Sequence, residues 1–249
     1  MSGRLHDKAA VVTGSARGIG ATIAALFVEE GARVVGIDRL PRPTDTPVIL
    51  HLTADITRAE QVSRAVTIAL EKLSRIDILI NNAGANVFYD PLRLQDAEWE
   101  ECLAIDLKAA WLVSKAVLPT MLAQSSGSIV NICSVHGHRI IPGCFPYPVA
   151  KHGLLGLTRA LGLEYARHGI RVNSISPGLI LTPQVEAWLQ SFPDPQQERR
   201  RQEELLPCRR LGSPEEVAHA ALFLASDEAP FINAADIVMD GGRSQLYHE

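Results

Sequence analysis

The sequence predicts an α/β fold in which a doubly wound parallel sheet of about seven strands is covered by helices on both faces. Short runs rich in valine and isoleucine alternate with helix-length amphipathic stretches along the whole chain. Several of these runs are apolar without interruption, as is typical of strands buried on both faces. The chain has 249 residues, of which 47% are hydrophobic and 21% charged, and no linker divides it. We therefore expect a single domain, 1–249.

Turn residues bound each expected element. The expected strands are 9–14, 32–38, 48–55, 76–82, 127–134, 170–177 and 236–242. The expected helices are 18–30, 57–73, 96–123, 147–167 and 214–226. Residues 41–47 are expected to form a surface loop. Residues 183–210 match neither the helical nor the strand period, and we expect them to form a lid segment at the substrate side of the domain.

Charge and cysteine content narrow the function classes. The net charge of −4 favours neither a nucleic-acid partner nor an anionic membrane. No apolar run is long enough to span a bilayer, and the first residues lack a signal-peptide pattern. The cysteines include no CxxC pair, which indicates reduced thiols. We expect a cytoplasmic protein without a metal site, since His136 and His138 have no third ligand at suitable spacing.

The first expected strand runs directly into TGSARGIG, residues 13–20, and then into a helix. Gly14, Gly18 and Gly20 would allow a tight turn, which lets backbone amides approach a pyrophosphate at the helix N-terminus. Their spacing, G-x-x-x-G-x-G, differs from G-x-G-x-x-G, and a glycine-rich turn without a ligand is the alternative. The position between a strand and a helix favours a dinucleotide site.

Asp38 ends the second expected strand. A carboxylate there can accept hydrogen bonds from the adenosine ribose and would repel a 2′-phosphate, which favours NAD over NADP. Arg17 and Arg39 point the other way, because either could reach a 2′-phosphate. The alternative for Asp38 is a solvated strand end.

The stretch YPVAK places Tyr147 one helical turn before Lys151, with a proline in the first turn. Alone, it fits a surface or packing pair. Together with TGSARGIG, NNAG (81–84), Ser134 and PGLILT (177–182), in this order, it resembles the short-chain dehydrogenase/reductase family over nearly the whole chain. The resemblance implies a Rossmann-type fold and an NAD(P)-dependent oxidoreductase.

The resemblance also implies roles for individual residues. Tyr147 would be the general acid/base, and Lys151 would lower its pKa and hold the nicotinamide ribose. Ser134 would hold the substrate oxygen during hydride transfer. For Asp55, which the resemblance places beside the cofactor, the alternative is a role in a turn that caps the next helix. The implied cofactor-binding positions are Gly14, Arg17, Gly18, Ile19, Gly20, Asp38, Arg39, Asp55, Ile56, Asn82, Ala83, Gly84, Tyr147, Lys151, Pro177, Gly178, Ile180 and Thr182.

One catalytic position departs from the family pattern. Asp106 in CLAIDLKAA stands where the family usually has an asparagine that helps to relay protons to the lysine. A carboxylate near Lys151 would favour the protonated lysine and weaken its help to the tyrosine. We expect the relay to survive with an altered pH dependence; the alternative is a purely structural hydrogen bond.

The substrate side is less defined by the sequence. Its candidates are Ser134, Asn86, His136, Cys144, Phe145, Gln184 and Trp188. Aromatic residues make up only 5% of the chain and the lid is polar, which favours a sugar or polyol over a steroid or long acyl chain. The alternatives are an NADP-dependent 3-oxoacyl-thioester reductase and a non-catalytic cofactor-binding regulator. The resemblance further implies a homotetramer with 96–123 and 147–167 at an interface, in which the C-terminal tail can reach a neighbouring active site.

Overall fold

The computed structural model of the chain describes residues 3–41 and 47–247. Its strands form one seven-stranded sheet in the order β3-β2-β1-β4-β5-β6-β7, and every pairing is parallel. The strands are β1 (Ala9–Thr13), β2 (Arg33–Asp38), β3 (Leu50–Thr53), β4 (Ile78–Asn81), β5 (Gly127–Ile132), β6 (Ile170–Pro177) and β7 (Asp236–Met239). The winding direction reverses between β1 and β4, and ligands of such sheets bind beyond the carboxyl ends at this switch point.

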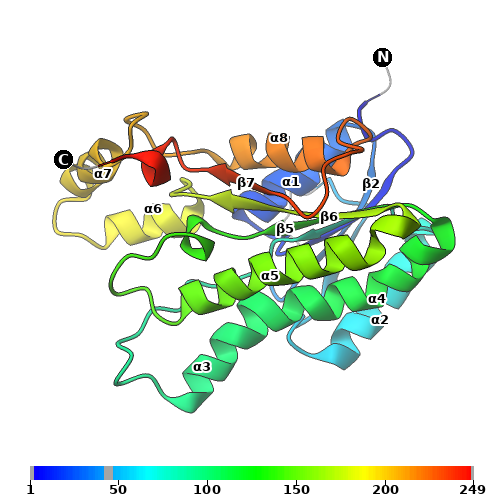
Figure 1. Cartoon of the computed structure of the whole chain (residues 1–249), viewed down its shortest axis with the longest axis horizontal. Helices are drawn as coiled ribbons and strands as arrows, with labels where there is room; N and C mark the ends of the chain where they lie inside the picture. Colours follow the sequence, from blue (N-terminus) through cyan, green and yellow to red (C-terminus); the bar gives the residue numbers. More distant parts are fainter. Residues whose placement is uncertain (1–2, 42–46, 248–249) are drawn as a thin grey trace.

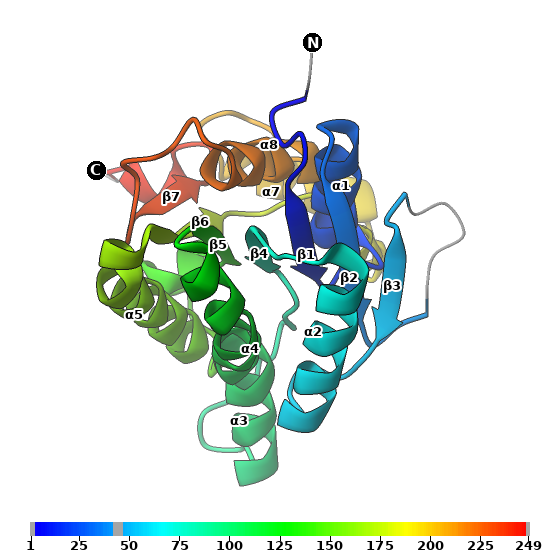
Figure 2. The same ribbon diagram turned by 90° about the vertical axis from the view of Figure 1, so that its right-hand side faces the viewer.

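Helices cover both faces of the sheet (Figure 1). Helices α1 (Gly18–Glu29) and α8 (Pro214–Ala225) lie on one face, and α2 (Ala59–Leu73), α4 (Ala109–Gln124) and α5 (Tyr147–Tyr165) lie on the other (Figure 2). Consecutive strand residues therefore enter different cores: Val11 is buried toward α2 and α4, and Val12 toward α1 and α8. This explains the uninterrupted apolar runs. Within the described ranges, no helix is both long and apolar enough to cross a membrane.

The predicted fold class is confirmed, and the expected strands and helices fall at their places with small shifts at the ends. The expected helix 96–123 is not continuous. It consists of α3 (Asp96–Leu103), a π-helical turn at Ala104–Lys108, and α4. The expected loop at 41–47 falls mostly on residues 42–46, which lie outside the described residues.

Residues 183–210, which match neither the helical nor the strand period in the sequence, form two helices in the structure. The segment contains α6 (Pro183–Gln190) and α7 (Pro195–Glu204). Each helix begins with a proline after a capping side chain: Thr182 Oγ1 accepts from the amide of Val185 at 3.3 Å, and an Asp194 oxygen accepts from that of Gln197 at 2.9 Å. Helix α7 consists almost entirely of polar residues, so the sequence shows no apolar periodicity there. An ion pair between Glu198 and Arg201, at 2.7 Å, stabilises the helix instead.

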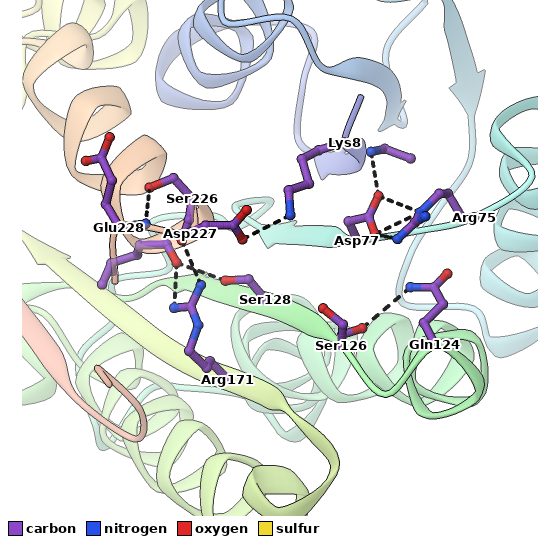
Figure 3. Close-up of polar contacts among 12 residues, drawn as sticks. Lys8, Arg75, Asp77, Gln124, Ser126, Ser128, Arg171, Ser226, Asp227 and Glu228 are labelled. Carbon is purple, nitrogen blue, oxygen red and sulfur yellow. Dashed lines mark hydrogen bonds and ion pairs between the residues drawn. The ribbon is translucent and has the colours of Figure 1, made fainter. Parts of the chain in front are cut away.

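Polar contacts connect neighbouring elements at the amino end of the sheet (Figure 3). The Asp77 carboxylate accepts from the buried amide of Ala9 at 2.9 Å and pairs with Arg75 at 2.5 Å. Nearby, Arg171 of β6 donates to the carbonyl oxygens of Leu224 at 2.8 Å and Ser226 at 3.1 Å, which ties the last turn of α8 to the sheet. At this end, the charged groups serve to join elements of the fold.

Candidate active site

A cleft of about 1900 Å³ lies beyond the carboxyl ends of the strands. Nearly all of the sequence-predicted site residues line it, drawn from segments that lie far apart in the chain. These are Gly14, Arg17, Gly18, Ile19, Asp38, Arg39, Asp55, Ile56, Asn82, Ala83, Gly84, Asn86, Asp106, Ser134, His136, Cys144, Tyr147, Lys151, Pro177, Gly178, Ile180, Thr182, Gln184 and Trp188.

Two predicted residues do not line the cleft. Gly20 lies beneath the glycine loop, where a Cβ atom would come within 2.1 Å of the Gly14 carbonyl oxygen, so it permits close packing of α1 rather than ligand contact. Phe145, expected on the substrate side, instead packs its ring against Trp99 with centroids 5.8 Å apart. Its neighbours Cys144 and Tyr147 line the cleft in its place.

The glycine loop has the geometry of a phosphate site. Gly14 and Gly18 have φ angles of +67° and +57°, in the left-handed region that favours glycine. Asn82 braces the loop by donating to the carbonyl oxygens of Thr13 and Gly14 at 3.0 and 3.1 Å. Arg17, the residue before α1, makes no side-chain capping bond, so the first amides of α1 remain available to an anion. These residues fit the pyrophosphate of a dinucleotide.

Two carboxylates line the part of the cleft beyond β2 and β3, which we call the adenosine end after its expected ligand. Asp38, the last residue of β2, accepts from the backbone amides of Ala16 and Leu40, each at 2.9 Å, which fixes its orientation. Asp55 accepts from the amide and the hydroxyl of Thr57 at 2.9 and 2.7 Å. Burial opposes ionisation of Asp55, but the bonds from Thr57 lower its pKa overall. Asp55 therefore forms the expected turn and lines the cleft as well.

Tyr147 is the first residue of α5 and Lys151 lies one turn later; both are buried. The Lys151 ammonium is 5.3 Å from the centroid of the Tyr147 ring. Burial raises the pKa of Tyr147 more than the positive charge of Lys151 lowers it, and the charge of Asp106 raises it further. Ser134, just past β5, also interacts with Tyr147 in the direction that favours the phenolate.

Asp106 projects from the π-helical turn toward the same lysine. Its Oδ1 lies 3.3 Å from Lys151 Nζ and accepts from the amide of Ala85 at 3.2 Å. Burial raises the pKa of Asp106, with Lys151 opposing. Burial would lower the pKa of Lys151, but the charges of Tyr147 and Asp106 outweigh it and raise the pKa. The lysine therefore stays protonated at neutral pH.

The absence of a side chain at Gly84, the last residue of NNAG, leaves room for Asp106 and Lys151. A Cβ atom there would approach Asp106 Oδ1 to 2.7 Å and Lys151 Nζ to 3.5 Å. The other carboxylate oxygen, Oδ2, is buried and has no hydrogen-bond partner within the described part of the chain. An unpaired buried oxygen of this kind lowers the stability of a folded protein.

The substrate end contains predicted and unpredicted residues. The ring of His136 lies edge-on to Tyr147, with centroids 6.0 Å apart, whereas His138 lies outside the cleft and pairs with Asp236 at 2.7 Å. Phe88 packs against Tyr147 at 5.7 Å without having been predicted. Other lining residues were not singled out individually from the sequence, because their positions depend on tertiary packing. They include Arg139, Ile140, Ile141, Arg201, Gln202, Leu206, Arg243, Ser244, Gln245, Leu246 and Tyr247.

Comparisons with known proteins agree with this geometry. The family profile described as enoyl-(acyl carrier protein) reductase matches residues 14–244. Oxidoreductase UcpA of Escherichia coli (strain K12) is 39% identical, over 96% of this chain and 95% of its own. The 3-oxoacyl-[acyl-carrier-protein] reductase FabG of Thermotoga maritima is 35% identical, over 96% of this chain and 98% of its own.

A solved structure extends the likeness to the whole fold. The ligand-free aldohexose dehydrogenase AldT of Thermoplasma acidophilum superposes with a TM-score of 0.95 and 32% identity, covering 100% of this chain and 98% of its own. The profile covers strands β2 to β7 and most of the residues that line the cleft, and each of these relatives covers 96% or more of the chain. The chain therefore belongs to the short-chain dehydrogenase/reductase family, NAD(P)-dependent oxidoreductases that act on CH–OH groups.

Proposed function

We propose that the protein is an NAD-dependent dehydrogenase that interconverts a secondary alcohol of a sugar or polyol with the corresponding carbonyl. The observation that carries this proposal is the convergence of Ser134, Tyr147 and Lys151 on one cleft, which has Asp38 at its other end. The residues of the glycine loop fit the cofactor. Bound NAD supplies a hydride acceptor for the alcohol carbon.

The protein residues supply the proton chemistry. The Ser134 hydroxyl holds the substrate oxygen, and the Tyr147 phenolate accepts the hydroxyl proton as the carbon gives up its hydride. The charge of Lys151 stabilises that phenolate. In the reverse direction, the Tyr147 phenol returns the proton to the carbonyl oxygen. Burial of the tyrosine and lysine strengthens their electrostatic coupling, because the surroundings screen charge less than water does.

The choice of NAD rests on Asp38. Its carboxylate is held by two backbone amides at the adenosine end, where it would accept hydrogen bonds from ribose hydroxyls and repel a 2′-phosphate. Arg17 and Arg39 also line this end and favour NADP. We give Asp38 more weight because its backbone bonds fix it in place.

The choice of a hydroxylated substrate rests on the substrate end of the cleft. Asn86, His136, Gln184, Gln202 and Gln245 line it and offer several hydrogen-bonding groups to such a substrate. The structural likeness to an aldohexose dehydrogenase supports the same class.

A second candidate is an NADP-dependent 3-oxoacyl-thioester reductase. The similarity to FabG favours it, as do Ile140 and Ile141, which are 64% and 47% exposed at the cleft and could contact an acyl chain. A non-catalytic cofactor-binding regulator is disfavoured by the complete set of Ser134, Tyr147 and Lys151. The cytoplasmic location, the homotetramer and the lid role of 183–210 remain predictions.

The test is coenzyme reduction, followed by absorbance at mildly alkaline pH, with NAD and NADP against aldoses, polyols and simple secondary alcohols. We expect turnover of a sugar or polyol with NAD, and we expect Asp38→Ser to lower the preference for NAD over NADP at least tenfold. Turnover that is NADP-linked only, and best with a 3-oxoacyl thioester in the reverse assay, would replace this function with the second candidate.

A further inference from the structure

Two arginines at the substrate end of the cleft lack an acidic partner. Arg139 follows the turn that contains His136, and Arg243 begins a 3₁₀ turn after β7; both line the cleft. Across residues 3–41 and 47–247, neither guanidinium forms an ion pair or a side-chain hydrogen bond. By contrast, Arg201 in the same cleft is paired with Glu198 at 2.7 Å. Cationic side chains without partners in a cleft are available to a ligand.

Both arginines lie near the reacting centre. The His136 ring is 6.0 Å from that of Tyr147, and its Nδ1 is within 3.2 Å of the carbonyl oxygen of Arg139. Arg243 lies close enough to act on the same ring: burial lowers the pKa of His136, the Arg139 carbonyl opposes this, and the charge of Arg243 lowers it further. The backbone of Arg139 and the charge of Arg243 therefore both act on His136, whose ring contacts that of Tyr147.

Backbone contacts hold Arg243 at the cleft. The Asp240 carboxylate accepts from the amides of Gly242 and Ser244 at 2.9 and 2.7 Å, and the Arg243 amide donates to the Asp240 carbonyl oxygen at 3.3 Å. Asp240 is thus used to build the turn, and it forms no ion pair with Arg243. This arrangement presents the guanidinium on a structured turn, which reduces the cost of fixing it upon binding.

The other carboxylates that line the cleft have different neighbours. Asp106 pairs with Lys151, and Asp38 and Asp55 belong to the adenosine end. Glu100 and Glu101 lie on α3, and neither pairs with Arg139 or Arg243. Within the described part of the chain, no carboxylate of the protein therefore neutralises Arg139 or Arg243 at the substrate end.

We propose that Arg139 and Arg243 form a subsite for an anionic group of the substrate, a carboxylate or a phosphate. This assignment rests on the proposed function and narrows its substrate class, a sugar or polyol, to sugar acids or sugar phosphates. Guanidinium groups bind both anions through paired, charge-assisted hydrogen bonds. Anchoring the anionic end would place a hydroxyl-bearing carbon near Ser134 and Tyr147.

The experiment compares NAD reduction with gluconate, glucitol and glucitol 6-phosphate, and with the same three compounds in the galacto configuration. Each set varies the terminal group while retaining a polyhydroxylated chain. We expect kcat/KM for the carboxylate or the phosphate to exceed that for the neutral alditol at least tenfold, and the preferred anion identifies the group that the subsite binds.

Arg139→Gln and Arg243→Gln then test the subsite. Each should raise KM for the preferred anion about tenfold or more, while KM for NAD and kcat/KM for the alditol change less than threefold. Arg159→Gln is the control, because Arg159 is exposed on α5 and lies outside the cleft. Equal turnover of anion and alditol, or equal losses for both in the variants, would overturn the subsite.

Binding separates failure of the subsite from failure of the proposed function. Trp188 lines the cleft, so its fluorescence can report ligands added to the NADH-loaded protein. If none of the compounds reduces NAD but gluconate or the phosphate binds, and binding weakens at least tenfold in Arg243→Gln, the proposed function fails and the subsite stands. If neither anion binds more tightly than glucitol, the subsite is wrong whatever the activity.

Discussion

The two ends of the sheet use buried aspartates in opposite ways. At the amino end, both oxygens of Asp77 are bonded, to the Ala9 amide and to the half-exposed Arg75. At the carboxyl end, one oxygen of Asp106 is bonded and the other has no partner among the described residues, and its partner Lys151 is itself 5% exposed. We propose from this difference that polar groups stabilise the fold at the amino end, whereas at the carboxyl end they act on the proton chemistry of the cleft.

Both aspartates are buried, and it is the exposure of their partners that differs: the Arg75 side chain is 51% exposed and the Lys151 side chain 5%. The charge of Arg75 faces water, so its field is screened. The Asp106 side chain is 0% exposed, and its charge acts on both Lys151 and Tyr147. Substitutions at the two ends should therefore have separable effects, on stability at one end and on catalysis at the other.

The largest effect is expected for Tyr147→Phe. Loss of the phenol removes the proton acceptor, and general acid–base groups contribute about 10²- to 10⁴-fold, so kcat should fall at least 100-fold. NADH binding, measured by fluorescence titration, and the thermal midpoint should stay close to wild type, because the ring packing is retained. Undiminished turnover would show that the tyrosine is not the acid/base and would revive the non-catalytic reading.

The next effect concerns Gly14→Ala. A Cβ atom there would lie 2.7 Å from Asn82 Nδ2 in a residue with φ of +67°, so both strain and a clash arise. We expect at least a tenfold loss of NADH affinity, together with lower stability. The matched control is Gly143→Ala, where φ is +85° but nothing lies within 4 Å, so only the strain of about 1–2 kcal/mol applies. Equal NADH affinities in the two variants would contradict a phosphate role for the loop.

A smaller effect is expected at the amino end, for Asp77→Asn. The amide can still accept from Ala9 but loses the charge that pairs with Arg75. We expect the free energy of unfolding in urea to fall by about 1–2 kcal/mol, with kcat and its pH dependence unchanged. A shifted pH–rate profile would contradict the expectation that polar groups at the amino end affect stability and not catalysis.

Much of the fold could be predicted, because the apolar runs and the glycine loop are local signals. The glycine motif around Gly14 lies in a single loop, and Tyr147 and Lys151 lie one helical turn apart, so both motifs are visible within a short stretch of sequence. The helix α7 could not be predicted from periodicity, since it buries few apolar side chains and depends on its cap at Asp194 and its ion pair. Nor could the sequence show that Arg243 lines the cleft of its own chain, because that position depends on the path of the chain after β7.

Phe145 shows the same limit within the site. Its position two residues before Tyr147 favoured a substrate contact. In the structure Cys144 and Tyr147 line the cleft, whereas the ring of Phe145 packs on Trp99. Asp106 shows the opposite case. The departure from the family asparagine indicated a carboxylate near Lys151, and the structure places the two 3.3 Å apart. What the sequence could not supply is the burial that determines how strongly that carboxylate acts.

The most direct test of this account is the pH–rate profile of Asp106→Asn beside that of the wild type. In the proposed mechanism, alcohol oxidation requires deprotonated Tyr147, so kcat should rise with pH through the pKa of that residue. The Asp106 charge raises that pKa, and its removal should move the rising limb to lower pH, with the plateau kcat within about threefold of wild type. A profile that coincides with the wild type would show that Asp106 is only a structural hydrogen-bond partner, and would contradict the assignment of the carboxyl end to proton chemistry.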